Sequence, residues 1–138
     1  MPKKVVMTQS SFTCIDATKR LDNPCWSKMY TNATNLSLFP FFQAGGFLTL
    51  LAALAYRGVV ALLPPGPPLN AQTVAEVVQA EDITTANLMP GVVADIANDP
   101  RLLPIFDKIS YVATGGGPLP ATAGALVAKK DQPANLVR

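Results

Sequence analysis

Three short stretches rich in glycine, proline and aromatic residues hold the best candidates for binding chemistry. They are Phe39–Gly46, Leu88–Gly91 and Thr114–Leu119, and each follows a run expected to form a strand. Ligands of an open parallel sheet gather beyond the carboxyl ends of its strands. The glycines of the third stretch would let the flat ring of a ligand approach the backbone. A tight strand-to-helix turn is the simpler explanation of the same glycines, and Gln43 in the first stretch is equally compatible with a plain helix entry.

Side chains suited to catalysis are scarce. The sequence has no histidine, which excludes Ser-His-Asp triads, Cys-His pairs and most zinc sites. Cys14 and Cys25 form neither a disulfide framework nor a metal motif, and Cys14 is expected to be a core residue. Glu81 and Asp82 are adjacent, so they favour a solvated helix end over an acid/base pair. No complete phosphate-binding loop or dinucleotide fingerprint is present. We predict no catalytic residue and no metal site from these residues.

The composition is typical of one globular domain. The 138 residues are 49% hydrophobic and 14% charged, which is too apolar for a disordered chain. The net charge is +2, and the 11 lysines and arginines are scattered along the chain. No basic face results, so we expect no nucleic-acid partner.

One apolar stretch, Leu36–Leu63, raises the alternative of a small membrane protein. Pro40, the pair Gly45-Gly46 and Arg57 interrupt it, and Phe47–Tyr56 is its longest uninterrupted run. A helix of about ten residues rises about 15 Å, roughly half of a bilayer core. We therefore interpret the stretch as a buried helix and strand of a cytoplasmic protein.

Strand and helix patterns alternate along the chain. Helix Phe47–Tyr56 is apolar on all sides and strand Val59–Leu63 is fully apolar, so both are expected to be buried. The loop Leu21–Ser27 and a helix running from Thr8 towards Arg20 precede them. The other predicted strands are Lys4–Met7, Asn35–Phe39, Ile83–Leu88 and Ile109–Ala113, and the other predicted helices are Ala71–Ala80, Val92–Asn98 and Ala121–Lys130. This order predicts an α/β fold with βαβ units around a mainly parallel sheet.

The order of these segments resembles an internal slice of the adenylation, or AMP-binding, domain of adenylate-forming enzymes. Met1–Ser11 is similar to the x-Pro-Lys end of that family's phosphate loop and the strand after it. Phe39–Gly46 is similar to the Pro-Leu/Met-Phe-His-x-x-Gly segment, with Gln43 in place of the usual histidine. Leu88–Gly91 resembles the strand that ends in proline, and Gly115–Leu119 the Gly-Gly-Ala/Gly-Pro-Leu turn. The resemblance covers residues 2–130 and is nearest to the fungal NRPS-like carboxylic acid reductases.

The resemblance implies a fold, ligands and site residues. The whole chain, 1–138, would be a partial AMP-binding domain, the N-terminal subdomain of the adenylate-forming fold truncated at both ends. Its ligands would be ATP or AMP and a small carboxylic acid, with magnesium in the complete family domain. The implied residues are Lys3 for phosphate, Gln43 and Gly46 for the acyl pocket, Met89 for the wall of that pocket, and Gly115, Gly116 and Gly117 for the adenine face.

Several family motifs have no counterpart in the sequence. These are the phosphate-loop donors, the Tyr-Gly-x-Thr-Glu segment, the ribose-binding aspartate and the catalytic lysine. Because they stabilise the charge at the α-phosphate, we expect a fragment or remnant of a secondary-metabolism enzyme that is inactive alone. A complementary chain would have to carry the missing segments. The alternative from another class is a non-catalytic interaction or structural α/β protein.

Overall fold

In the part of the chain that the structure describes, four short parallel strands form the sheet around which the helices pack. The computed structural model describes residues 8–10, 25–63 and 65–128. The strand order is β2-β1-β3-β4, and the register aligns Leu36 with Ala86 and Ala86 with Val112. The strands are β1 (Thr34–Ser37), β2 (Val59–Leu62), β3 (Thr85–Leu88) and β4 (Tyr111–Thr114). The predicted α/β class and parallel sheet are confirmed.

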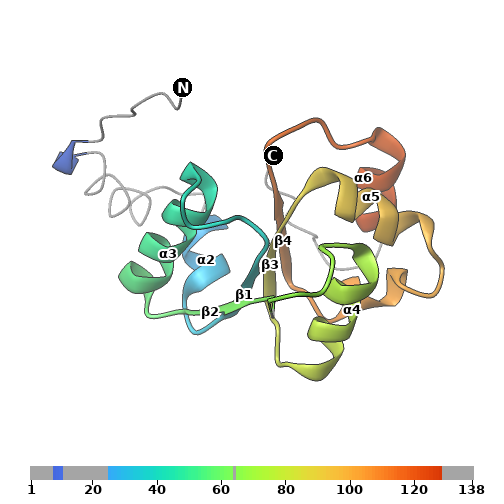
Figure 1. Cartoon of the computed structure of the whole chain (residues 1–138), viewed down its shortest axis with the longest axis horizontal. Coiled ribbons are helices and arrows are strands. Elements are labelled where there is room, and N and C mark those ends of the chain that lie inside the picture. The colour runs from blue at the N-terminus through green and yellow to red at the C-terminus, as the bar shows by residue number, and fades with distance from the viewer. Residues whose placement is uncertain (1–7, 11–24, 64, 129–138) are drawn as a thin grey trace.

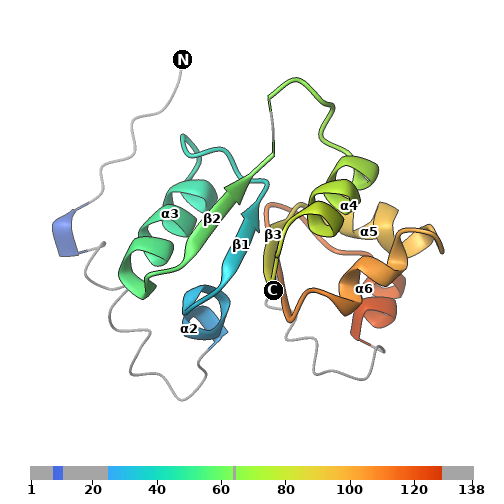
Figure 2. The same ribbon diagram turned by 90° about the horizontal axis from the view of Figure 1, so that it is seen from below.

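The helices cover both faces of this sheet (Figures 1 and 2). Two lie on one face, α2 (Cys25–Tyr30) and α3 (Ala44–Tyr56). The other face carries α4 (Ala71–Ala80), α5 (Pro90–Asn98), the 3-10 helix η2 (Leu103–Asp107) and α6 (Ala121–Ala128). The connection from β1 to β2 leads towards one edge of the sheet. The connections from β2 to β3 and from β3 to β4 lead towards the opposite edge. Right-handed crossovers therefore place α3 opposite α4 and α5.

The two faces of the sheet differ in chemistry. Leu36, Ala86 and Val112 point towards α4, α5 and α6 and join the larger apolar core. Successive residues of a strand point to opposite faces, so their neighbours face α2 and α3. There, Asn35 and Asn87 lie beside a smaller apolar cluster that includes Tyr30, Ala52 and Tyr56. Polar side chains of the sheet are thus buried on one face only.

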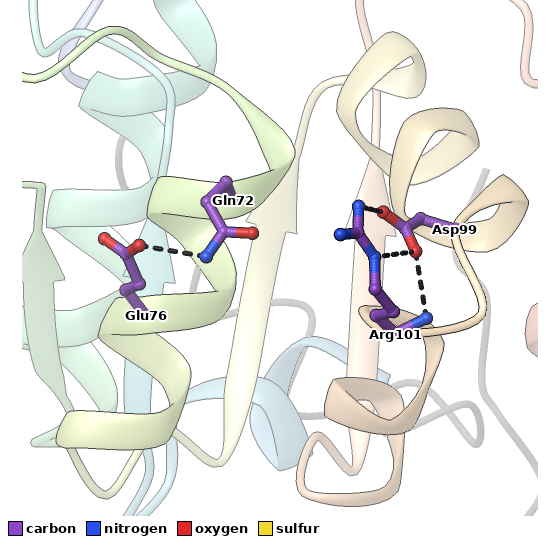
Figure 3. Close-up of polar contacts among 4 residues, drawn as sticks. All are labelled: Gln72, Glu76, Asp99 and Arg101. Atoms are coloured by element: carbon purple, nitrogen blue, oxygen red, sulfur yellow. Dashed lines mark hydrogen bonds and ion pairs between the residues drawn. The ribbon is translucent and has the colours of Figure 1, made fainter.

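Local signals explain the best predicted helices. The side chain of Asn70 accepts a hydrogen bond from the Thr73 backbone N–H at 2.9 Å, so α4 begins where the sequence predicted. On the solvent side of α4, Gln72 donates to Glu76 at 2.9 Å (Figure 3).

The end of α5 is stabilised by a local ion pair. Asp99 is the residue after this helix, and its carboxylate accepts hydrogen bonds from the backbone N–H, Nε and Nη2 of Arg101 at 2.9, 3.0 and 2.7 Å (Figure 3). These bonds lower the pKa of Asp99 to about 2.

Two predictions of burial are wrong. Helix α3 begins earlier than expected, at Ala44, and exposes one side, where Leu54 is 71% accessible to solvent. Strand β2 is at the edge of the described sheet, and its Val59 and Leu62 are 59% and 52% exposed. Both differences have the same cause: an apolar sequence is typical of a central element, but the strand order places this one at the border of the described sheet.

The remaining predictions concern the N-terminal elements and the alternative of a membrane protein. The predicted loop Leu21–Ser27 is wrong at its end, because α2 begins at Cys25. The strand Lys4–Met7, and the helix towards Arg20 apart from residues 8–10, lie outside the described residues. In the part of the chain that the structure describes, no helix is both long and apolar enough to span a bilayer.

Candidate ligand-binding site

A cavity of about 390 Å³ opens where the strand order changes direction, between β1 and β3. The chain leaves β1 towards one edge of the sheet and β3 towards the other, and the crevice outside the carboxyl ends of such strands is where ligands of open α/β sheets bind. Its wall comes from the segment after β1, the first turns of α3, and the ends of β3 and β4. The lining residues are Phe39, Gln43, Ala44, Gly45, Leu48, Thr49, Asn87, Ala113, Thr114, Gly115 and Gly116.

The structure brings some of the predicted site residues together and separates others. Gln43, Gly115 and Gly116 line this cavity, although they are far apart in sequence. Gly46, Gly117 and Met89 are absent from its lining. Lys3 lies outside the described residues.

Gly46 has a packing role in this structure. It is buried in α3, and a Cβ there would lie 2.3 Å from the carbonyl oxygen of Pro40 and 2.4 Å from that of Phe39. Only glycine allows the helix to approach the preceding segment so closely. Gly46 therefore fixes the position of the neighbouring cavity residues Gln43 and Gly45.

Met89 and Gln43 are both N-cap residues, of α5 and α3, and neither makes a side-chain cap hydrogen bond. Met89 is half-buried and packs against the larger core, on the α4 and α5 side of the sheet. Gln43 is exposed at the cavity, and its backbone carbonyl accepts from the N–H of Phe47 at 3.0 Å. The Gln43 amide is thus available to a ligand from the helix entry.

The glycines after β4 leave open space above the backbone. A Cβ built at Gly115 or Gly116 would meet no atom within 4 Å. Gly116 also has a φ of +89°, in the left-handed region that favours glycine, so the turn itself requires it. At Gly115 the space is open without this backbone requirement. The turn therefore explains why residue 116 is a glycine, whereas at Gly115 only the approach of a ligand would explain it.

Beneath the cavity lies a buried polar network that the sequence analysis missed. Asn87 Nδ2 lies 2.8 Å from the Tyr30 hydroxyl, 2.9 Å from Thr49 Oγ1 and 3.1 Å from Asn35 Oδ1. Asn35 Nδ2 donates to Thr85 Oγ1 at 2.9 Å. Burial raises the pKa of Tyr30, which keeps its hydroxyl neutral. The available signal was the alternation of polar and apolar residues at positions 35–37 and 85–88, which places Asn35, Ser37, Thr85 and Asn87 on one face.

The hydroxyl of Thr114 differs from those of the network in its hydrogen bonding. Its Oγ1 is buried and has no hydrogen-bond partner among the described residues. The residue stands at the end of β4, on the cavity wall.

None of the described residues that line the cavity carries a charge. No group of three or more acidic, cysteine or histidine residues in the described ranges could hold a metal ion. The described wall thus offers van der Waals contact, backbone groups and neutral hydrogen bonds to a ligand.

Comparison with known families identifies the chain. The model of the AMP-binding enzyme family matches residues 1–133. The chain belongs to the AMP-binding enzyme family. The broader part of the predicted resemblance is thereby confirmed.

Solved structures of adenylate-forming enzymes share the fold. The K483A mutant of the amide bond synthetase McbA from Marinactinospora thermotolerans is 25% identical, with a TM-score of 0.63 over 86% of this chain and 23% of that one. A malonyl-CoA ligase with methylmalonyl-CoA and AMP bound is 20% identical, with a TM-score of 0.69 over 89% of this chain and 26% of that one. The N-terminal subdomain of NpsA from Klebsiella oxytoca, in complex with 3-hydroxyanthranilyl-AMSN, is 14% identical, with a TM-score of 0.66 over 81% of this chain and 28% of that one.

These matches define which part of the family fold is present. The four-stranded parallel sheet and its helices match the N-terminal subdomain of adenylate-forming enzymes. The chain spans roughly a quarter of the length of the structures it matches.

Proposed function

We propose that this chain is the acid-binding and adenine-facing part of an enzyme that activates a carboxylic acid as its acyl-adenylate. The observation that carries the proposal is the cavity between β1 and β3, where the strand order changes direction. Its lining includes Gln43, Gly115 and Gly116. Family membership supports ATP or AMP as the nucleotide. Bound ATP would supply the adenylyl group that activates the acid.

The residues divide this task between them. Gly115 and Gly116 would offer bare backbone to the adenine ring, since no atom lies within 4 Å of either Cβ position. The acid would enter the apolar part of the cavity beside Gln43. Lys3 would contact phosphate, whereas Gly46, Gly117 and Met89 would shape the surroundings. Magnesium would bind to the complete family domain, and no metal ligand is assigned to this chain.

The lack of charged residues in the described cavity wall affects whether the chain alone can form an acyl-adenylate. Attack of a carboxylate on the α-phosphate develops negative charge that cations and N–H donors must stabilise. The described lining residues contribute no cation. We therefore propose that the chain alone does not form an acyl-adenylate, and that a complementary chain supplies the missing groups. The exposed apolar strand β2 supports such a partner, because Val59 and Leu62 offer it apolar surface and no other described strand pairs with its outer edge.

Narrower assignments are proposals of the same kind. The sequence resemblance supports an NRPS-like carboxylic acid reductase of secondary metabolism, acting in the cytoplasm. The test is an assay of the 138-residue chain for ATP–pyrophosphate exchange with a panel of carboxylic acids. No exchange above background is expected, and exchange in a contaminant-free sample would contradict the proposed inactivity.

Nucleotide binding is tested by titrating AMP into the isotope-labelled chain and following backbone amide shifts. We expect shifts at Gly115 and Gly116 with a dissociation constant around 1 mM, about 4 kcal/mol of binding. Gly115→Ala adds a methyl group to the ligand's space and should abolish the shifts. Gly117→Ala is the matched control, because it lies off the cavity and also has no atom within 4 Å of its Cβ position. If AMP moves no amide in this turn at about 10 mM, the proposed adenine site is wrong.

A further inference from the structure

Asn87 connects the cavity to the buried network beneath it. It lies on β3, lines the cavity and is only 4% exposed. Its side-chain amide has a donor end, Nδ2, and an acceptor end, Oδ1. Which end the network uses decides which end remains for a ligand.

One chain of hydrogen bonds fixes this orientation from the backbone of α2. Thr85 Oγ1 lies 2.8 Å from the carbonyl oxygen of Met29, which only accepts, so the hydroxyl donates there. The same Thr85 oxygen must then accept from Asn35 Nδ2, at 2.9 Å. Asn35 Oδ1 is left facing Asn87 at 3.1 Å, and an oxygen there requires a donor from Asn87. Asn87 must therefore present Nδ2 to Asn35.

A second chain, from the backbone of α3, requires the same orientation. Thr49 Oγ1 donates to the carbonyl oxygen of Gly45 at 2.9 Å, and so it can only accept from Asn87 at 2.9 Å. Asn35 Oδ1, Thr49 Oγ1 and the Tyr30 hydroxyl oxygen share the two hydrogens of Asn87 Nδ2. Two backbone carbonyls at separate places thus fix the direction of the Asn87 amide.

The acceptor end of Asn87 is then left over. None of the hydrogen bonds of Asn87 with described residues uses Oδ1, and this oxygen is not among the buried atoms without a partner, so it is accessible from the cavity that Asn87 lines. We propose that the acid bound in this cavity carries a hydroxyl or amino group on its acyl part, and that Asn87 Oδ1 accepts a hydrogen bond from that group. The inference rests on the proposed function and deepens it, since it names the class of acid.

The other residues that line the cavity further define which acid it would bind. Phe39, Leu48 and Ala113 supply apolar surface on the same wall. The cavity volume, about 390 Å³, suits a ligand with one ring. A group that only accepts hydrogen bonds, such as a fluorine, would meet the lone pairs of Oδ1 and gain nothing. The fixed amide thus discriminates between substituents of similar size.

The wild-type chain tests this with a matched set of acids. Benzoate, its three hydroxy isomers, 3-aminobenzoate and 3-fluorobenzoate are titrated separately, and binding is followed by the shifts of the Asn87 side-chain amide. We expect at least one hydroxybenzoate or the aminobenzoate to bind about tenfold more tightly than benzoate and 3-fluorobenzoate. Equal affinities across the set, or no binding by any of these acids, would overturn the inference. The AMP titration decides the proposed function separately.

Two variants locate the preference. Asn87→Ala removes the acceptor, and the ratio of hydroxybenzoate to fluorobenzoate affinity should fall to near one. Thr49→Val combined with Thr85→Val breaks both chains that orient the Asn87 amide, so the amide can turn, and this double variant should lower the same ratio. Thr73→Val is the matched control, because this buried threonine on α4 donates to the Pro68 carbonyl, away from the cavity. A ratio that stays at its wild-type value in a folded Asn87→Ala chain, or in a folded chain with both Thr49→Val and Thr85→Val, would overturn the inference. If either fails to fold, the wild-type series still decides it.

Discussion

The side-chain amide of Asn87 lies 2.8 Å from the hydroxyl of Tyr30, and this contact joins β3 to α2 across 57 positions of the sequence. Both side chains are buried on the face of the sheet that carries polar residues. The same amide lines the cavity at the ends of the strands. The stability of the smaller core and the shape of the candidate site therefore depend on the same few hydrogen bonds.

Tyr30→Phe should lower the free energy of unfolding by about 1–2 kcal/mol, because a buried hydrogen-bonded hydroxyl is lost. Urea denaturation followed by circular dichroism measures this change. Tyr111→Phe is the control, since Tyr111 packs at the same face but is only half-buried. Equal small effects from the two substitutions would contradict the role given to the Tyr30 hydroxyl.

Gly46→Ala should destabilise the chain by about 1–3 kcal/mol, as overpacking does. Its Cβ would lie too close to the carbonyl oxygens of Phe39 and Pro40, which are backbone atoms and cannot move aside alone. Gly91→Ala, in α5, should instead stabilise by about 0.5–1 kcal/mol, because nothing lies within 4 Å and alanine favours a helix. Thermal unfolding of the two variants should move in opposite directions. A Gly46→Ala chain as stable as the wild type would refute the close approach.

The uneven exposure of α3 predicts uneven tolerance of charge. Ala52→Asp would bury an unpaired carboxylate at a residue that is 1% exposed, which costs several kcal/mol against a marginal stability. We expect this variant to unfold or precipitate. Leu54→Asp, on the exposed side of the same helix, should fold and remain in solution. The comparison is made by soluble yield and amide dispersion, and loss of both variants would contradict the one-sided burial.

Local sequence signals predicted much of this fold. The α4 helix was predicted from Ala71 to Ala80 because the Asn70 cap and the spacing of its valines are local. The exposure of β2 was not predictable, because an apolar run does not show whether its strand is central or at an edge. The network was missed for a related reason: Asn35 and Thr85 are 50 positions apart, and only the pairing of β1 with β3 brings them together.

The candidate site was predictable to the same extent. Loops after strands indicated Gln43 and the glycines, because strand ends of a parallel sheet meet at one edge. The positions of Gly46 and Met89 depend on how closely α3 and α5 approach their neighbours, which is a matter of packing. Asn87 lies inside β3, and a polar residue within a strand does not by itself indicate a binding site as a loop motif does.

Acid should weaken the ion pair at the end of α5. Arg101 lowers the pKa of Asp99 from 3.8 to about 2 in the folded chain, so the carboxylate contributes stability above pH 4 and loses that contribution as the pH falls from about 4 to 2. Asp99→Asn should thus be less stable than the wild type at neutral pH, by a small amount because the pair is exposed, and the difference should shrink towards pH 2. Arg101→Gln should show the same pH dependence. A difference that is constant from pH 7 to pH 2 would contradict the assignment.

The buried hydroxyl of Thr114 gives the last prediction. Its oxygen has no partner among the described residues, so folding removes it from water without a compensating hydrogen bond. Thr114→Val has nearly the same shape and should leave the free energy of unfolding unchanged or raise it by up to about 1 kcal/mol. Thr85→Val is the matched comparison, because the Thr85 hydroxyl both donates to Met29 and accepts from Asn35, and its loss should cost about 1–3 kcal/mol. Urea denaturation of both variants, with the wild type in parallel, measures the contrast. If Thr114→Val lost as much stability as Thr85→Val, the Thr114 hydroxyl would have to be hydrogen-bonded in solution. That result would contradict the orientation of the Thr114 side chain on the cavity wall.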